Sequence, residues 1–138
     1  MRADFASDSV DSITCLQTIK LVYEERNYLL DPHTAVAWEV AANLRGENPV
    51  LIASTAHWAK FCNNVYRALH DIAPGEDLPT DIQALTGCEL NERIAAETGG
   101  RSIPEGLATL DSRPIRFNTV IDAGKDNVEA STEAFLAD

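Results

Sequence analysis

The stretch Pro49-Val-Leu-Ile-Ala-Ser-Thr-Ala-His57 decides the fold class of this 138-residue chain. Residues 49–54 form a short, nearly continuous apolar run with β-branched side chains, which is typical of a strand covered on both faces. Strands of that kind usually belong to parallel sheets. From His57 onward the apolar residues recur at helical spacing as far as Leu69. The stretch therefore predicts a strand, a turn and a helix in succession.

Helical patterns dominate the chain on both sides of this unit. Residues 9–26 begin with capping residues and then carry apolar side chains three and four positions apart, which predicts a helix with one apolar face. Asp31 followed by Pro32 predicts a second helix start, and the alanine-rich run that follows ends at Gly46. Further helices are expected over residues 80–86, 89–97 and 104–110, with a last one capped by Asp126 and running through Leu136.

Strands are few in this pattern. Beside residues 49–54, only Ile115–Ile121 alternates like a strand, and Arg2–Ala6 would be a third if it is extended. A buried parallel strand cannot stand alone in a domain, because its backbone groups need neighbouring strands. We therefore predict an α/β fold of the parallel-sheet type and infer that the chain is a helix-rich piece of a larger protein.

Composition and charge exclude several classes of function. Apolar residues make up 45% and charged residues 24%, which is the ordinary balance of a folded domain. The net charge of −11, with no compensating basic patch, argues against a nucleic-acid partner. No apolar run approaches the roughly 20 residues of a membrane span, and the N-terminus lacks a secretion signal. Three widely spaced cysteines favour a reducing compartment, so we expect a cytoplasmic protein.

Polar side chains that could carry chemistry gather at two predicted helix starts. Asp31 and His33 open one helix, while Ser54, Thr55 and His57 join the end of the strand to the next. Ligands bind at that edge of open α/β sheets, so the five side chains would form one site if the two elements are neighbours. A hydroxyl there could bond a heterocyclic nitrogen or an oxyanion, and it could equally be a plain helix cap.

Two other chemistries use the same residues. A hydrolase would take Ser54 or Thr55 as nucleophile and a histidine, His33 or His57, as base, but no Gly-x-Ser-x-Gly turn supports it. A metal site would add Cys62 to the aspartate and the histidines, but structural zinc prefers local ligand pairs that the chain lacks. We therefore expect no metal site.

Three stretches together resemble the C-terminal part of threonine synthase. They are Phe5-Ala-Ser-Asp-Ser-Val-Asp11, Tyr28-Leu-Leu-Asp-Pro-His-Thr-Ala-Val36 and Ser54-Thr-Ala-His-Trp-Ala-Lys-Phe61. Their order and spacing match over roughly residues 3–70, although Trp58 stands where proline is common in the family. The final strand and helix around Phe117 to Leu136 resemble the terminal unit of the family.

This resemblance implies a pyridoxal 5′-phosphate enzyme of fold type II that converts O-phospho-L-homoserine and water into L-threonine and phosphate. It implies that Thr55 bonds the pyridine nitrogen of the cofactor. A neutral hydroxyl partner, unlike a carboxylate, would not force that nitrogen to stay protonated. The resemblance further implies that Ser54, His57, Asp31 and His33 line the same end of the cofactor pocket.

The resemblance also defines what this chain lacks. The Schiff-base lysine of the family and its phosphate-cradling glycine-rich loop have no counterpart here, and none of Lys20, Lys60 and Lys125 has a comparable setting. The implied partner is therefore the remainder of the threonine synthase chain. We expect no catalytic residue in this chain and weak or absent cofactor binding by the chain alone.

Residues 1–70 would then be the C-terminal part of the large cofactor-binding domain. Residues 71–138 would be a helical extension with a terminal strand–helix unit. A fragment of this kind is expected to expose apolar surface and to self-associate. The alternative is an independently folded, non-catalytic binding or interaction module derived from the enzyme.

Overall fold

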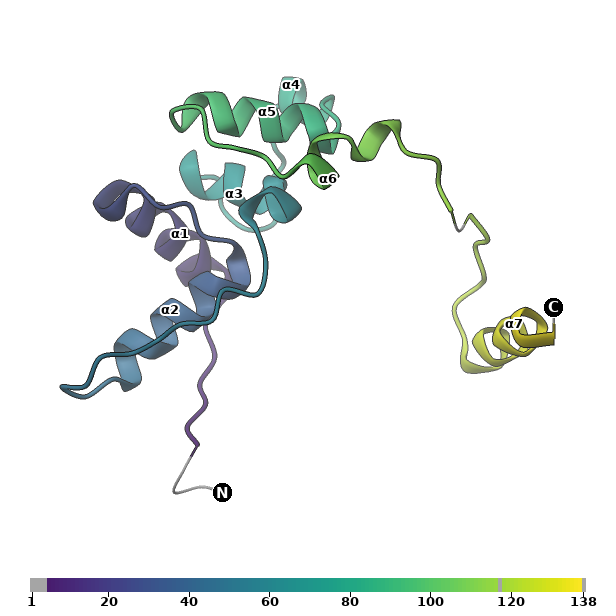
Figure 1. Ribbon diagram of the computed structural model, residues 1–138, viewed down its shortest axis with the longest axis horizontal. Coiled ribbons are helices and arrows are strands. Elements are labelled where there is room, and N and C mark those ends of the chain that lie inside the picture. Colours follow the sequence, from purple (N-terminus) through teal and green to yellow (C-terminus); the bar gives the residue numbers. More distant parts are fainter. Residues whose placement is uncertain (1–4, 117, 138) are drawn as a thin grey trace.

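The computed structural model describes residues 5–116 and 118–137, and the regular secondary structure of these residues is all helical (Figure 1). The α-helices in chain order are α1 (Ser12–Arg26), α2 (Pro32–Leu44), α3 (Cys62–Leu69), α4 (Thr80–Gln83), α5 (Gly87–Glu97), α6 (Glu105–Ala108) and α7 (Lys125–Ala137). Two 3₁₀ helices, η1 (Trp58–Phe61) and η2 (Leu110–Ser112), precede α3 and follow α6. We call the part from α1 to η2 the helical body.

Local capping fixes the two long N-terminal helices where the sequence predicts them. The Asp11 side chain accepts a hydrogen bond from the Thr14 N–H (2.7 Å) and caps α1, whereas Ser9 lies outside the helix. Asn27 ends α1 in the left-handed conformation (φ 50°). Asp31 caps α2, and Pro32 at its first position sacrifices no helical hydrogen bond. These two predicted helices are confirmed.

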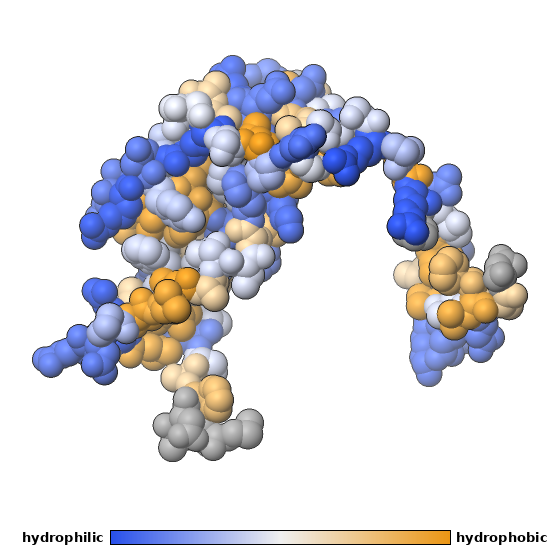
Figure 2. Space-filling view, viewed as in Figure 1, coloured by the Kyte–Doolittle hydropathy of each residue, from blue (hydrophilic) through white to orange (hydrophobic). Residues whose placement is uncertain are grey.

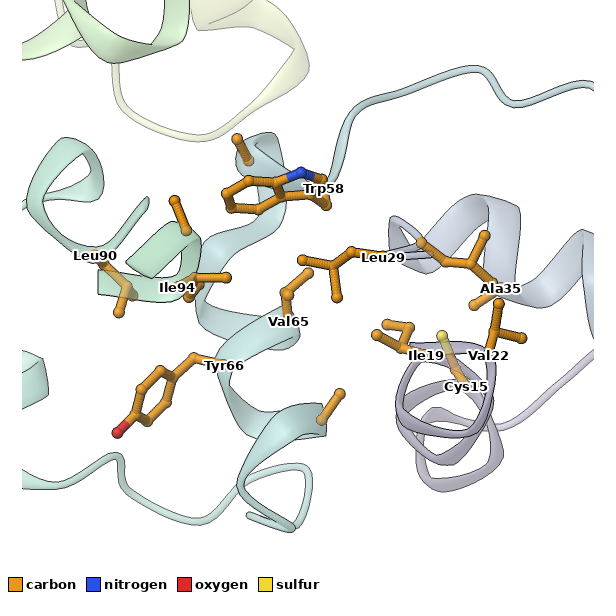
Figure 3. Close-up of a cluster of buried hydrophobic side chains, with 14 of the residues drawn as sticks. Cys15, Ile19, Val22, Leu29, Ala35, Trp58, Val65, Tyr66, Leu90 and Ile94 are labelled. Atoms are coloured by element: carbon orange, nitrogen blue, oxygen red, sulfur yellow. The ribbon is translucent and has the colours of Figure 1, made fainter. Parts of the chain in front are cut away.

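The core lies where α1, α2, η1, α3 and α5 meet. In Figure 3, Val65 of α3 lies between Ile94 of α5 and Leu29 of the α1–α2 connection. Val65 and Ile94 are fully buried, and Trp58 is 5% exposed. The predicted helix after His57 is confirmed, but it begins as a 3₁₀ turn because η1 comes before α3. Burial of these side chains is the main favourable term that holds the helical body together.

The chain after α5 turns back onto α1. Gly99 (φ 89°) and Gly100 (φ 78°) adopt left-handed conformations that other residues take only with strain. This turn brings Arg101 to the end of α1, where its Nη2 atom donates to the backbone oxygen (2.8 Å) and side-chain oxygen (2.7 Å) of Asn27. The guanidinium also lies 5.3 Å from the centre of the Tyr23 ring. Arg101 thus ties the second half of the chain to the first.

The parallel sheet that the sequence predicts is not confirmed by the described residues. Residues 49–54 have no strand pairing, and the described ranges 5–116 and 118–137 contain no strand. The predicted strand over residues 115–121 is irregular where it is described, and Phe117 lies outside the described residues, as do positions 1–4 of the third candidate strand. A strand needs partners for its backbone N–H and C=O groups, and the described residues supply none.

The C-terminal part stands apart from the helical body. Figure 1 shows α7 at the end of a long connection, well away from α5 and α6. The helix has no buried residue, and Phe135 (71% exposed) and Leu136 (76% exposed) are on its surface. Because α7 begins at Lys125, Asp126 lies in its first turn and is not its cap. Figure 2 shows apolar surface gathered over this helix.

Candidate functional site

A buried carboxylate organises the start of α2. The Asp31 side chain is fully buried, and its Oδ1 atom accepts from the backbone N–H groups of His33 (2.9 Å) and Thr34 (3.4 Å). The Nδ1 atom of His33 lies 3.1 Å from the same oxygen. The other oxygen, Oδ2, accepts a hydrogen bond from the Thr34 hydroxyl. Both carboxylate oxygens of Asp31 therefore have hydrogen-bond partners within the same turn.

The Thr34 hydroxyl links this turn to a segment twenty positions further along the chain. Its Oγ1 atom lies 3.1 Å from Oγ of Ser54. The Ser54 hydroxyl also lies 3.2 Å from the backbone oxygen of Ala56, to which it can donate. The predicted convergence of the two helix starts is therefore observed, with Thr34 as the residue that joins them.

His57 caps the helical turn that follows Ser54. Its Nδ1 atom accepts from the Ala59 N–H (3.2 Å), and the ring lies close to the Trp58 indole, with 5.3 Å between their centres. Burial lowers the pKa of His57 below its ordinary value, while the negative charge of Asp31 acts in the opposite direction. The neutral ring, which keeps Nδ1 as an acceptor, is thereby favoured.

These groups line a cavity of about 270 Å³, which we call the Ser54 cavity. The residues around it that carry polar side chains are Tyr28, Asp31, Ser54, His57, Arg101 and Ser102. The Nε atom of Arg101 is buried and has no hydrogen-bond partner within the described part of the chain. Arg101, Ser102 and Tyr28 escaped the sequence analysis; the Gly99-Gly100 pair was the signal for the turn that brings the first two here.

The remaining predicted site residues, Thr55 and His33, do not line the Ser54 cavity. Thr55 is exposed and is not among the residues that line it, and the cofactor role implied for it stays a prediction. The His33 side chain is 61% exposed and packs at a tilt on Phe61, with 4.8 Å between ring centres. Of the five predicted residues, Asp31, Ser54 and His57 therefore share one cavity wall.

This geometry gives little support to the two alternative chemistries, a hydrolase and a metal site. The hydrogen-bond partners of the Ser54 hydroxyl are Thr34 and Ala56, neither of which could serve as a general base. Over the residues that the structure describes, no group of three or more histidine, cysteine, aspartate or glutamate side chains could hold a metal ion.

Within the same residues, no helix combines the length and the apolar character that crossing a membrane requires.

Comparison with known proteins defines the class to which this fold and this site belong. A family described as "Threonine synthase, C-terminal" matches residues 34–131, which include Thr34, Ser54, His57 and Arg101. The chain therefore belongs to the threonine synthase C-terminal family.

The individual relatives agree with this assignment. Threonine synthase-like 1 of Mus musculus is 43% identical over 70 residues, which are 50% of this chain and 9% of the relative. Threonine synthase of Schizosaccharomyces pombe is 37% identical over 73 residues, covering 49% of this chain and 14% of the relative. Threonine synthase of Saccharomyces cerevisiae is 31% identical over 124 residues, which are 78% of this chain and 24% of the relative. The chain thus spans less than a quarter of the length of these relatives, and no solved structure matches it significantly.

The titration of His57 provides a direct test of this geometry. In the wild-type chain, NMR should show the His57 ring titrating below the ordinary histidine range, because burial lowers its pKa. Asp31→Asn should lower the His57 pKa further, since it removes the charge that opposes this shift. A rise in the His57 pKa in the variant would contradict the predicted coupling.

The sign of the associated pH effect follows from this direction. A histidine whose pKa is lowered by folding stabilises the folded chain above the pKa of the unfolded state. That contribution is lost as the pH falls through the lower, folded-state value, because protonation then favours unfolding. His57 should therefore contribute to acid sensitivity, and not to sensitivity at alkaline pH.

Proposed function

We propose that this chain is the C-terminal segment of a threonine synthase, and that the complete enzyme converts O-phospho-L-homoserine and water into L-threonine and phosphate. The observation that carries the proposal is the hydrogen-bonded link from Asp31 through Thr34 to Ser54, of which Thr34 and Ser54 lie inside the region that matches the family. It gathers polar groups of two distant segments around one cavity, as a ligand site requires.

The Ser54 cavity is suited to one end of a pyridoxal 5′-phosphate molecule. Its volume of about 270 Å³ lies just below the range of pockets that hold a complete small molecule. The Nε atom of Arg101 is buried and has no hydrogen-bond partner within the described residues, which supports a polar ligand group nearby. When bound, the cofactor supplies an electron sink for reactions of amino acids. Ser54 and His57 would hold the ring end, with Asp31 behind them, and we propose that Thr55 and His33, which do not line this cavity, contact the cofactor only in the complete enzyme. The rest of the cofactor site would come from the remaining polypeptide.

Catalysis by this chain alone is not part of the proposal. No lysine lines the Ser54 cavity. Lys20 pairs with Asp71, and Lys125 lies 3.4 Å from Glu129, so two of the three lysines are engaged elsewhere. Lys60 is exposed and lies in η1. The reactive lysine and the phosphate cradle would have to be supplied by the remainder of a threonine synthase chain.

The exposure of residues 49–54 supports the proposal that another polypeptide segment pairs with them. Leu51 is 97% exposed and Val50 is 50% exposed, although their sequence pattern is that of a covered strand. Isolated exposed apolar residues are common, but a strand-like run without strand partners is a site for pairing with another segment. We propose that this run becomes a strand of the parallel sheet of the complete enzyme, and that self-association of the isolated chain uses the same surface.

Complementation tests this function. The chain is mixed with a threonine synthase truncated before the corresponding C-terminal region, and phosphate release from O-phospho-L-homoserine is measured. Activity is expected only in the mixture. Leu51→Asp should abolish it while the isolated chain stays folded, because Leu51 contacts little in this chain. Leu110→Asp, at a side chain that is also exposed but lies in η2, is the matched control and should still restore activity.

The outcome separates the two functions that the sequence leaves open. Restored activity supports the enzyme segment. Absence of activity, with both proteins folded by circular dichroism, would contradict that proposal and favour the non-catalytic interaction module. Equal loss in the Leu51 and Leu110 variants would contradict the role of residues 49–54 in particular.

A further inference from the structure

An apolar groove lies on the surface where α1, α2 and α3 meet. Its volume is about 440 Å³, and it shares no lining residue with the Ser54 cavity. The apolar side chains around it are Val10, Leu16, Pro32, Val36 and Pro74. We call it the Arg67 groove, because Arg67 supplies its permanent charge and none of the described residues that line it is acidic.

The Arg67 guanidinium can bind a further partner in this groove. Its Nη1 atom donates to the backbone oxygen of Ala73 (3.1 Å), which leaves most of its N–H groups available. The salt bridges among the described residues include none to Arg67, although its side chain is half-buried. A cation beside apolar surface suits a partner that combines apolar side chains with carboxylates.

A neighbouring hollow is less suited to an acidic partner. Arg67 borders this hollow too, but its lining includes the carboxylates of Glu24, Glu39 and Asp71. These negative charges would repel the carboxylates of an approaching segment. An acidic segment is therefore expected to bind in the Arg67 groove and not in this hollow.

The C-terminal helix α7 has the character that the Arg67 groove requires. Val128, Phe135 and Leu136 lie at spacings that place them on one face of the helix, and all three are exposed. Glu129 and Glu133 border this face, since residues three or four positions apart are neighbours on a helix. An isolated helix of this length is marginally stable in water, so α7 is expected to need a partner for its apolar face.

We propose that α7 of one copy of this chain binds in the Arg67 groove of a second copy, with Phe135 and Leu136 against the apolar wall and Glu133 paired with Arg67. In the single chain, α7 stands well away from α1 and α2 at the end of a long connection, and none of its residues lines the groove (Figure 1). A reciprocal exchange closes at two copies and makes the same contact twice. It goes beyond the proposed function and is separate from the pairing proposed for residues 49–54.

Sedimentation analysis of the chain over a range of concentrations tests the apolar part of this contact. The Leu51→Asp variant serves as the background, because it weakens association through residues 49–54, and it is expected to form a dimer. Phe135→Ala should weaken that dimer about tenfold or more, since it removes an aromatic anchor while alanine favours the helix. Val120→Ala, at an exposed apolar side chain before α7, is the matched control and should change the dissociation constant by less than about twofold.

Two results of this experiment would overturn the proposal. One is a Leu51→Asp chain that stays monomeric at every concentration. The other is an equal effect of the Phe135 and Val120 substitutions, which would place the contact between copies outside α7.

Charge reversal tests the ionic pair. Arg67→Glu and Glu133→Arg should each weaken the dimer about tenfold or more, because like charges would then meet in both contacts. The two substitutions in one chain should restore the dissociation constant to within about threefold. Arg45→Glu, at an exposed position outside the groove, changes the net charge equally and should have little effect. A double variant that stays as weak as the single ones would overturn the pairing.

Mixing the Arg67→Glu chain with the Glu133→Arg chain distinguishes a second copy from docking of α7 within its own chain. In a dimer with one chain of each kind, the altered helix meets the altered groove and the unaltered helix meets the unaltered groove. Both contacts are then complementary, so the mixture should dimerise at a concentration at which each variant alone is monomeric. A mixture that stays monomeric would overturn the exchange between copies.

Discussion

Replacing Ile94 with alanine should lower the free energy of unfolding by about 2–5 kcal/mol, the usual range for truncating a fully buried isoleucine. Ile94 is 0% exposed and belongs to α5, and it lies beside Leu90 and Val65 in the core (Figure 3). The contacts between α3 and α5 are among the main links of the helical body. A cavity at this position removes contacts that nothing else in the chain can replace.

Urea unfolding followed by circular dichroism measures this effect. Ile13→Ala is the matched control, since Ile13 lies in α1 with its side chain 58% exposed. That variant should change the free energy of unfolding by less than about 1 kcal/mol. Equal effects of the two substitutions would mean that α5 does not pack against α3 as described.

Asp31→Ala should be the most damaging single substitution of a polar residue, with a loss of about 2–4 kcal/mol in the free energy of unfolding. Removal of a helix cap accounts for about 1 kcal/mol. The rest arises because the buried Thr34 hydroxyl loses its bond to a carboxylate and keeps only its contact with Ser54, and a hydrogen bond to a charged group contributes about 1.5–3 kcal/mol. The same variant should weaken the link between α2 and the segment that holds Ser54.

The comparison with Asp11 isolates the contribution of burial. Asp11 caps α1 through the same kind of bond to a backbone N–H, but it is exposed at the helix start. Asp11→Ala should therefore cost only the cap and should lower the stability less than Asp31→Ala does. Thermal unfolding of the two variants should show a clearly lower midpoint for Asp31→Ala. A larger effect at Asp11 would contradict the structural role assigned to Asp31.

The features that the sequence predicts well are those decided by neighbouring residues. The start of α2 follows from Asp31 and Pro32 alone, because capping and the fixed proline backbone act within one turn. The pairing of residues 49–54 could not be tested in the same way, since strand formation depends on partners that the described chain does not contain. The run nevertheless carries the pattern of a covered strand, and its exposure is what the proposed pairing with another segment would explain.

The candidate site could be predicted only in part. The residue types at Asp31, Ser54 and His57 marked them, and the structure places all three on one cavity. The contact between Thr34 and Ser54 depends on how two helix starts meet, which spacing along the chain does not determine. Arg101 reaches Asn27 across 74 positions, so its place in the cavity wall depends on the packing of the whole helical body.

The position of Trp58 has a practical consequence. Its indole belongs to the buried core and also borders the Ser54 cavity, whereas Trp38, the other tryptophan, is half-buried in α2. In a Trp38→Phe background, intrinsic fluorescence would come from Trp58 alone. The emission of Trp58 would then report two events. Exposure of the indole to solvent on unfolding would shift the emission to longer wavelength, and a conjugated ring that stacks nearby in the Ser54 cavity would quench it.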